Sequence, residues 1–322
     1  MIILVVFGHL IEPIINKSAV IKTIYMFIYS FHMPIFIILA GALTKLDVSA
    51  KQTSKNIKTL IVPFLIFTVL YEIFNFIGTQ SISSYTSNLQ PYWILWFLFS
   101  LFIWKVTLPI IMQFKFPLLL SVVISLLAGY VSEIGYFLGL SRTLYFFPFF
   151  ILGYKLGSSI LSNKFLIKIP PILYVAVLIA NVAVFWLFQD MPRQWLYGSL
   201  SYERLGNLEW YSFIIRSLLY FISFASSVAI LMLMSSRESI LSTRGKNSLF
   251  VYVWHGFFVK VAIYFGVLEV LGTASAAFTL ITLLILAALI TAVLSCAFVA
   301  KLTDKLLFVP AQRILLIKSQ YK

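Results

Sequence analysis

The feature that most constrains the fold is a succession of ten long apolar runs separated by short polar segments. Most of the runs are close to the ~20 residues that an α-helix needs to cross a bilayer. An open strand in lipid would leave backbone groups without hydrogen bonds, so each run predicts a membrane helix. The sequence therefore predicts an all-α fold, a polytopic membrane helix bundle of about ten transmembrane helices. The runs are residues 1–15, 20–44, 57–79, 91–113, 117–133, 142–161, 170–188, 209–234, 247–268 and 276–300.

The composition is that of a membrane protein and limits the chemistry of any site. Hydrophobic residues make up 61% of the 322 residues and charged residues 11%, against about half and about a quarter in an average soluble chain. Cys296 is the single cysteine, so neither an intramolecular disulfide nor a thiolate metal cluster can form. The longest polar stretch, about 189–208, is too short to fold alone. We therefore expect a single membrane domain over residues 1–322.

The net charge is +14, and the positions of the basic residues along the chain indicate how the protein is oriented in a membrane rather than that it binds nucleic acid. The basic residues occupy short loops and form no continuous patch, so no nucleic acid is expected as a partner. The loops after the even-numbered runs and the tail hold sixteen of the 24 basic residues, and the alternate loops hold about five. This bias predicts cytoplasmic even-numbered loops and cytoplasmic N- and C-termini. The sixteen are Lys45, Lys51, Lys55, Lys58, Lys115, Lys155, Lys164, Lys168, Arg237, Arg244, Lys246, Lys301, Lys305, Arg313, Lys318 and Lys322.

The ends of the runs carry two further signals. The first run is short, begins at Met1 without a basic segment and lacks a small-residue cleavage site, so it is a poor signal peptide. We expect this helix to have lost its cytoplasmic start, with the N-terminus truncated. Aromatic residues near several run ends are interpreted as anchors at the membrane–water interface. These are Tyr92, Trp93, Trp96, Trp195, Tyr197, Trp210 and Tyr211.

Ionisable side chains inside membrane helices are costly and are candidates for function. His9 lies in the first run and Glu12 follows three residues later, on the same helix face. A carboxylate beside a histidine can orient its ring and stabilise the charged form. The alternative is a histidine that only bonds to a neighbouring helix.

The other two histidines lie in later runs. His32 is in the middle of the second run, two residues before Pro34, which frees a backbone carbonyl. Either His32 belongs to a functional site or it bonds the carbonyl that Pro34 frees. His255 lies early in the ninth run and is expected nearer the cytoplasm.

Three further charged residues are expected in the outer half of the membrane, together with His9. Glu72 lies toward the outer end of the third run and requires a cationic partner there. Arg142 begins the sixth run, and Arg216 lies in the outer part of the eighth. These groups can converge with His9 on one pocket, although interfacial snorkelling is the better explanation for Arg142 taken alone.

Motifs of soluble enzymes are absent from the sequence. It contains no GxSxG, HExxH or Walker loop and no cysteine–histidine metal spacing. The three histidines have no ligand spacing that supports a zinc site, so no metal is expected.

Five stretches together resemble the acyltransferase 3 family, most closely its branch of fucose 4-O-acetylase and related membrane acetyltransferases. The FGH and SFHMPIF motifs are fairly specific, and the later stretches support them. The resemblance runs from Met1 to about residue 260. The stretches are IILVVFGHLIEP, IYSFHMPIFIILAGAL, SRTLYFFPFFILGYKLG, WLYGSLSYERLG and GKNSLFVYVWHGF.

The resemblance implies a multi-pass plasma-membrane enzyme that moves an acyl group, usually acetyl, from cytoplasmic acyl-CoA to a sugar hydroxyl. The acceptor would be a cell-surface glycan, an exopolysaccharide or a lipid-linked precursor, with acetyl-CoA as the donor. The family's essential histidine in the first helix corresponds to His9. Family sequences also carry a basic residue about ten positions before it, which would precede Met1 and agrees with the expected truncation.

The chemistry of O-acetylation accounts for these residue types. A sugar hydroxyl needs a base, and histidine titrates near neutral pH. We therefore predict His9 as the base, oriented by Glu12 or another carboxylate, with His32 as a second catalytic residue. The oxyanion needs a cation or donor, which Arg142 or Arg216 would supply. Glu72 and His255 complete the predicted substrate-binding residues together with these arginines.

Two questions stay open at the level of sequence. The acyl group can pass directly to the hydroxyl or through an acyl-histidine intermediate. A saccharide or lipid-intermediate transporter or flippase would also explain the spans and buried charges, but it does not predict a histidine pair in the first two helices. Transporters often contain internal repeats, and none is visible. A glycan polymerase usually needs a larger external loop than residues 189–208.

Overall fold

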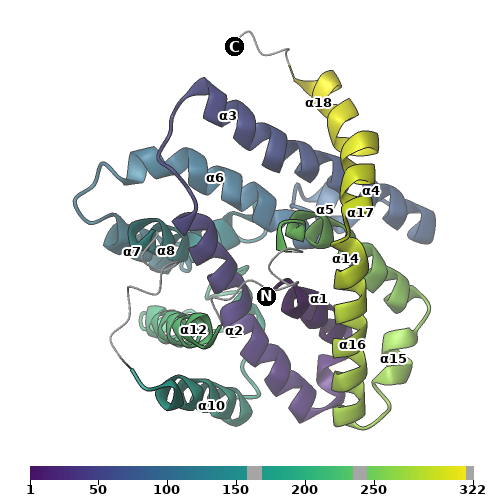
Figure 1. Cartoon of the computed structure of the whole chain (residues 1–322). Coiled ribbons are helices and arrows are strands. Elements are labelled where there is room, and N and C mark those ends of the chain that lie inside the picture. The colour runs from purple at the N-terminus through teal and green to yellow at the C-terminus, as the bar shows by residue number, and fades with distance from the viewer. Residues whose placement is uncertain (158–168, 235–244, 317–322) are drawn as a thin grey trace. The chain divides into compact units, whose positions relative to one another are not determined.

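The computed structural model describes residues 1–157, 169–234 and 245–316, and every regular element within these ranges is a helix. Six of the described helices are long and apolar enough to cross a membrane, and shorter apolar helices accompany them. Each of the ten predicted runs overlaps at least one described helix (Figure 1). The predicted polytopic membrane bundle is therefore confirmed. The long helical stretches are Ala19–Ala42, Ala50–Thr79, Trp93–Ile111, Phe137–Leu156, Ser212–Leu233 and Ala276–Leu294.

The chain divides into two compact units. Unit 1 comprises the described parts of residues 1–37, 159–197 and 214–300, and unit 2 comprises those of 38–158, 198–213 and 301–322. The single membrane domain expected from the sequence stays a prediction. The helices of unit 1 are α1 (Ile2–Ile11), η1 (Glu12–Lys17), α2 (Ala19–Ala42) up to Ile37, α10 (Pro171–Leu187), α11 (Gln194–Tyr197), α12 (Ser212–Leu233) from Ile214, α14 (Ser248–Tyr264), α15 (Val267–Leu271), α16 (Ala276–Leu294) and the start of α17 (Ala297–Thr303).

Unit 2 contains the remaining described elements. They are the end of α2, then α3 (Ala50–Asn56), η2 (Ile57–Ile61), α4 (Val62–Thr79), α5 (Ser84–Ser87), η3 (Trp93–Leu95), α6 (Trp96–Ile111), α7 (Pro117–Ala128), η4 (Phe137–Gly139), α8 (Leu140–Leu156), the first residues of α12, the end of α17, η5 (Asp304–Phe308) and α18 (Val309–Leu315).

Helix α1 packs against α14 and α16 in unit 1 (Figure 1). Polar contacts also join the helices of this unit, which matters because lipid supplies little hydrophobic drive for helix association. Lys17 Nζ of η1 lies 2.8 Å from Glu269 Oε2 of α15. Asn181 of α10 donates to Ser30 Oγ of α2 at 2.8 Å and to Ser226 Oγ of α12 at 2.7 Å.

The first apolar run is not one uninterrupted helix. Helix α1 ends at Ile11, and the chain continues as the 3₁₀ helix η1 from Glu12 to Lys17. Pro13 lies at the start of η1 and has no N–H to continue the α-helical hydrogen bonds. The break places Glu12 at the junction of the two helices, one turn after His9.

Two π-helical turns in unit 2 also precede prolines. The turn η2 comes just before Pro63 at the start of α4, and η5 comes just before Pro310 at the start of α18. A proline inside a continuous helix lacks an N–H and crowds the carbonyl four residues earlier. A widened turn relieves that crowding without ending the helix. This explains why the predicted span 57–79 joins α3 as one longer helical stretch, Ala50–Thr79.

In unit 2, α8 packs against both α6 and α7, and polar contacts join its first turn to α6. Thr143 of α8 shares a hydrogen bond of 2.6 Å with Ser100 Oγ of α6. The backbone carbonyl of Thr143 also accepts from Trp104 Nε1 at 2.8 Å. These bonds satisfy the polar groups of buried side chains within the apolar core.

The end of α2 approaches α8 closely through two glycines. A Cβ atom added at Gly153 would overlap the backbone carbonyl of Ile38, and one added at Gly41 would overlap that of Phe150. Small residues at helix crossings allow backbones in membrane bundles to pack closely. The glycines therefore set the distance between these two helices.

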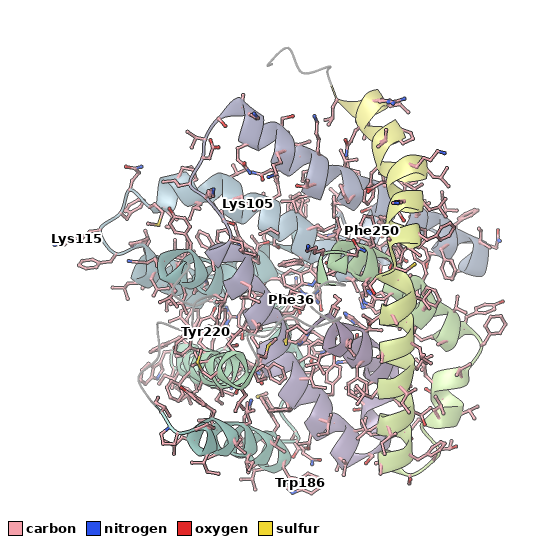
Figure 2. All side chains as sticks on the ribbon, in the orientation of Figure 1. Phe36, Lys105, Lys115, Trp186, Tyr220 and Phe250 are labelled. Carbon is pink, nitrogen blue, oxygen red and sulfur yellow. The ribbon has the colours of Figure 1, made fainter. Side chains whose placement is uncertain are left out.

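The outer surface carries apolar side chains that suit contact with lipid. Trp186 is exposed on the outer side of α10 (Figure 2). Trp210 and Tyr211 are exposed too, as interfacial anchors require. The anchor interpretation is wrong for other aromatic residues near run ends, because packing within the protein buries them. These are Tyr92, Trp96 and Trp195.

The predicted orientation of the chain in the membrane rests on lysine and arginine residues in the loops and the C-terminal tail. Lys115 lies at the tip of the loop between α6 and α7 and is exposed (Figure 2). The cytoplasmic location of this loop and of both termini stays a prediction. Six of the basic residues that support it lie outside the described residues: Lys164, Lys168, Arg237, Arg244, Lys318 and Lys322.

Replacing Gly153 by alanine tests the close contact between α2 and α8. The added methyl group meets backbone that cannot rotate away, so we expect a loss of about 1–3 kcal/mol of stability. That loss should lower the thermal unfolding midpoint of the protein in detergent by several degrees. Gly78→Ala is the matched control, because nothing lies within 4 Å of its added Cβ. Equal midpoints for the two variants would contradict the packing described here.

Candidate functional site

His9 occupies the last turn of α1 and contacts the carboxylate of Glu12 at the start of η1. The distance from His9 Nδ1 to Glu12 Oε2 is 3.3 Å. Both side chains are largely buried, with 15% and 21% of their side-chain surface exposed. The contact is the one that the three-residue spacing predicts, and it lies in unit 1.

A second helix brings aromatic hydroxyl groups to the same imidazole. The hydroxyl of Tyr29 on α2 lies 3.3 Å from His9 Nδ1. The ring of Tyr29 stacks on that of Tyr25, with centroids 4.1 Å apart. Gly8 makes this approach possible, because a Cβ atom there would lie 3.0 Å from Tyr29 Cε2. The glycine of the FGH motif therefore has a packing role beside the histidine.

The remaining oxygen of Glu12 is bound by the segment before α12. Tyr197 donates its hydroxyl to Glu12 Oε1 at 3.0 Å, and the hydroxyls of Tyr197 and Tyr25 are in contact. Arg193 Nη1 donates to the backbone carbonyl of Glu12 at 3.4 Å, with its guanidinium 5.9 Å from the Tyr197 ring centroid. Glu12 thus joins α1 to a polar segment almost two hundred residues further along the chain.

The pKa values of Tyr197 and Arg193 are both shifted so that each side chain keeps the proton it donates. Burial raises the pKa of the Tyr197 hydroxyl well above its usual range, and the Glu12 carboxylate raises it further. Burial alone would lower the pKa of Arg193, but Tyr197, Tyr25 and Glu12 together raise it. Tyr197 therefore keeps its proton and Arg193 its charge near neutral pH.

His32 lies close to the same cluster but bonds to its own helix. It is 2% exposed, and its Nδ1 lies 2.8 Å from the carbonyl of Ile28. The Tyr29 ring meets it edge-on, with centroids 4.5 Å apart. Pro34 frees the carbonyl four residues before it, that of Ser30. The alternative in which His32 bonds the freed carbonyl is therefore wrong, because its partner is Ile28.

His255 lies next to His9, which the sequence did not predict. Helix α14 packs on α1, and the centroids of the two imidazoles are 5.4 Å apart with the rings tilted by 34°. The side chain is fully buried, and Nδ1 lies 3.0 Å from the carbonyl of Val251. Helix α14 begins at Ser248 and carries His255 near its middle, and the location of His255 nearer the cytoplasm stays a prediction.

Arg216 also belongs to unit 1 and is 2% exposed within α12. Interfacial snorkelling does not describe such a buried guanidinium. Glu72 and Arg142, by contrast, belong to unit 2. The predicted convergence of these three residues with His9 on one pocket stays a prediction.

The carboxylate of Glu72 binds the short helix α5. It accepts hydrogen bonds from the Ser83 backbone N–H at 2.8 Å, from Ser83 Oγ at 2.5 Å and from Thr86 Oγ1 at 2.8 Å. The guanidinium of Arg142 lies over the rings of Trp96 and Tyr136, 5.4 and 5.6 Å from their centroids. Both residues thus have clear packing roles within unit 2.

The arrangement around His9 can act as a carboxylate–imidazole pair. Glu12 accepts a hydrogen bond from Nδ1–H and so leaves the Nε2 lone pair as a base. The described residues include no group of three or more His, Cys, Asp or Glu side chains placed to hold a metal ion. A pair of this kind can support proton transfer at the imidazole.

Four residues of this cluster were missed by sequence reasoning. Tyr25 and Tyr29 had a detectable signal, because positions 25, 29 and 32 share one face of a helix. Tyr197 was assigned only as an interfacial anchor, and Arg193 was only one of the five basic residues counted in the alternate loops. Nothing in the local sequence connects those two residues with Glu12.

Comparison with known proteins gives one match. A family model described as an acyltransferase domain, that of acyltransferase 3, matches residues 1–300 of the chain. No curated protein and no solved structure matches. The matched range includes all three histidines, His9, His32 and His255.

Selective chemical modification tests which imidazole is accessible. His9 has 15% of its side chain exposed, whereas His32 and His255 are 2% and 0% exposed. We therefore expect diethyl pyrocarbonate at neutral pH to modify His9 and neither of the other two histidines. Mass spectrometry of the peptides identifies the modified residue. His9→Gln should abolish the modification. Labelling of His32 or His255 in the folded protein would contradict the burial described here.

The raised pKa of Tyr197 predicts the pH at which its hydroxyl ionises. The absorbance difference between wild type and Tyr197→Phe isolates this phenol and should show no tyrosinate near the usual pKa of about 10. A raised pKa means that the protonated donor persists into more alkaline solution. Ionisation near pH 10 would show that Tyr197 is solvated and not held against Glu12.

Proposed function

Since the chain belongs to the acyltransferase 3 family and is a membrane-embedded acyltransferase, we propose that it O-acetylates a saccharide. The donor is acetyl-CoA on the cytoplasmic side of the plasma membrane. The acceptor is a hydroxyl of a cell-surface glycan, an exopolysaccharide or a lipid-linked precursor. Both termini face the cytoplasm, which the distribution of lysine and arginine supports.

The observation that carries the proposal is the contact between His9 Nδ1 and Glu12 Oε2 at 3.3 Å. Transfer to an alcohol needs a base, because a sugar hydroxyl is a weak nucleophile while protonated. A buried imidazole with one nitrogen hydrogen-bonded to a carboxylate presents the other nitrogen in a fixed direction. His9 is therefore the proposed base, and Glu12 the residue that orients it.

The reaction that this geometry supports begins with proton transfer from the acceptor hydroxyl to His9 Nε2. The alcohol oxygen then attacks the thioester carbonyl, and a tetrahedral oxyanion forms. When the C–S bond breaks, the sulfur of CoA takes the proton from Nε2 and leaves as a thiol. The Glu12 carboxylate stabilises the imidazolium that exists between these steps.

The other proposed residues serve binding and charge stabilisation. Arg216 is the proposed partner of the oxyanion, supported by the burial of its charge in the unit that holds His9. Arg142 and Glu72 remain proposed substrate-binding residues, and His32 a second residue of the site. If His9 Nε2 instead takes the acetyl group itself, a covalent acyl-histidine precedes the attack of the alcohol.

The decisive experiment is replacement of His9 by alanine. We expect transfer of labelled acetyl from acetyl-CoA to extracted glycan to fall to background, because the base is gone. Because His9→Ala also leaves Glu12 Oε2 without its imidazole partner, thermal unfolding is measured in parallel, and His9→Gln, whose amide can still donate to Glu12, serves as the matched variant that keeps a donor but lacks the base. His9→Ala protein that retains transfer would remove this residue from the mechanism.

The same assay separates the enzyme from a transporter. A transporter or flippase would move saccharide across vesicle membranes without consuming acetyl-CoA. Substrate movement that is independent of acetyl-CoA, in a protein that releases no CoA thiol, would refute the acetyltransferase. Trapping with radiolabelled acetyl-CoA in the absence of acceptor distinguishes the two chemical routes, because only the acyl-histidine route labels the protein.

A further inference from the structure

Each oxygen of the Glu12 carboxylate lies against a different donor. His9 Nδ1 lies 3.3 Å from Oε2, and the hydroxyl of Tyr197 donates to Oε1 at 3.0 Å. An ionised carboxylate only accepts hydrogen bonds, so both groups give it a proton to share. The first donor is one helical turn away, whereas Tyr197 lies 185 positions further along the chain. The carboxylate is therefore held from two sides, and only one of them is local in sequence.

The contact with His9 is too weak to fix the Glu12 side chain by itself. At 3.3 Å it is longer than the usual range for an N–H to oxygen hydrogen bond. The hydroxyl of Tyr29 lies at the same distance from Nδ1 and competes for the same proton. Glutamate has several rotatable bonds, and ordering them costs conformational entropy. A second donor on Oε1 stops the carboxylate from turning away from the imidazole.

The segment that carries Tyr197 is anchored to α2. Gln189 Nε2 donates to Thr23 Oγ1 at 3.4 Å, and the hydroxyls of Tyr197 and Tyr25 are in contact. A phenol has one proton, and that of Tyr197 goes to the carboxylate, so Tyr25 is the donor in the contact between the two phenols. The hydroxyl of Tyr197 is thus fixed by a donor on one side and an acceptor on the other.

We propose that Tyr197 and Arg193 are positioning residues that hold Glu12 against His9 during acetyl transfer. Tyr197 fixes the carboxylate through Oε1, and Arg193 fixes the backbone by donating to the carbonyl of Glu12 at 3.4 Å. Both act through Glu12, which keeps the proton of the neutral imidazole on Nδ1 and the lone pair on Nε2. The proposal rests on the proposed function and adds to it two residues of the segment before α12.

The chemistry of the two donors suits a step in which His9 gains a proton. Tyr197 is a neutral donor, so it fixes the carboxylate without cancelling the negative charge that stabilises the imidazolium. Its raised pKa keeps it a donor near neutral pH. Arg193 carries a full charge, but its hydrogen bond goes to the backbone carbonyl of Glu12. The carboxylate charge is thereby left for His9.

Kinetics of two tyrosine variants test the role of Tyr197. Wild type, Tyr197→Phe and Tyr264→Phe are assayed by release of CoA thiol from acetyl-CoA with extracted glycan. Tyr197→Phe should lower kcat by about 10- to 100-fold and leave the KM for acetyl-CoA within about twofold, because it removes a hydrogen bond to a charged group that positions the base. Tyr264→Phe removes the same atom from an exposed residue of α14 and should keep the wild-type rate.

A double-mutant cycle shows whether Tyr197 acts through Glu12. In the Glu12→Ala background the phenol has no carboxylate to position, so adding Tyr197→Phe should change kcat by less than about twofold. An equal fold loss in both backgrounds would mean that the tyrosine acts independently of Glu12, and would overturn the proposal.

The tautomer of His9 is a second readout, and it needs no turnover. ¹⁵N NMR of protein labelled in its three histidines distinguishes a ring protonated on Nδ1 from one protonated on Nε2, and the signals lost in His9→Gln belong to His9. Neutral His9 of wild type should carry its proton on Nδ1. Tyr197→Phe should shift the ring toward the Nε2–H tautomer, and Arg193→Gln should do so to a smaller extent, because the carboxylate can then leave Nδ1. A merely structural role would instead disturb the signals of all three histidines together.

The outcomes separate this proposal from the proposed function. Unchanged kcat and an unchanged His9 tautomer in Tyr197→Phe and Arg193→Gln overturn the positioning role and leave the acetyltransferase standing. If Tyr197→Phe does not fold, Arg193→Gln decides by the same two measurements. A wild-type protein that transfers acetyl to no glycan overturns the proposed function, even where the tautomer of His9 depends on Tyr197. A loss of kcat that requires Glu12, together with a shifted tautomer, supports both.

Discussion

The hydrogen bond between the His9 imidazole and the Glu12 carboxylate is the interaction on which the candidate site depends. A carboxylate among apolar membrane helices is costly unless its oxygens are bound by donors. Glu12 meets this condition because Tyr197 binds one oxygen and His9 the other. Arg193 adds a cation at the backbone of the same residue. The result is an imidazole whose Nδ1 is held by a carboxylate, an arrangement that suits a general base.

The architecture was largely predictable from the sequence because lipid leaves the backbone few alternatives. Apolar runs of spanning length must become helices, and each of the predicted runs overlaps a described helix. Their interruptions were harder to place. Pro13, Pro63 and Pro310 produce a 3₁₀ helix and two π-turns, and hydropathy contains no information on which form a proline will take. Burial of Tyr92 and Trp96 was also unpredictable, because an aromatic residue at a run end suits either an interface or a core.

The site was predictable only where its contacts are local. The spacing of His9 and Glu12 places both on one helix face, and the structure has them in contact. Tyr29 was within reach of the same argument, because it precedes His32 by one turn. His255 and Tyr197 are different, since they meet His9 and Glu12 only through the packing of helices far apart in sequence. Such contacts depend on helix order and rotation, which the composition of a run does not determine.

Glu12 and Glu72 show how environment separates two carboxylates of similar sequence context. Both are isolated acidic residues in apolar runs, and sequence reasoning treated both as parts of one site. Glu72 accepts its hydrogen bonds from the backbone N–H and hydroxyls of the segment that begins α5, so its charge stabilises a local fold. Glu12 accepts from an imidazole, a group that can change its own protonation during a reaction. A carboxylate that binds an imidazole can act on a proton during a reaction, whereas the hydrogen bonds from Ser83 and Thr86 to Glu72 hold the start of α5 in place. The partners of each carboxylate, more than its position in a membrane helix, therefore determine which of the two is suited to catalysis.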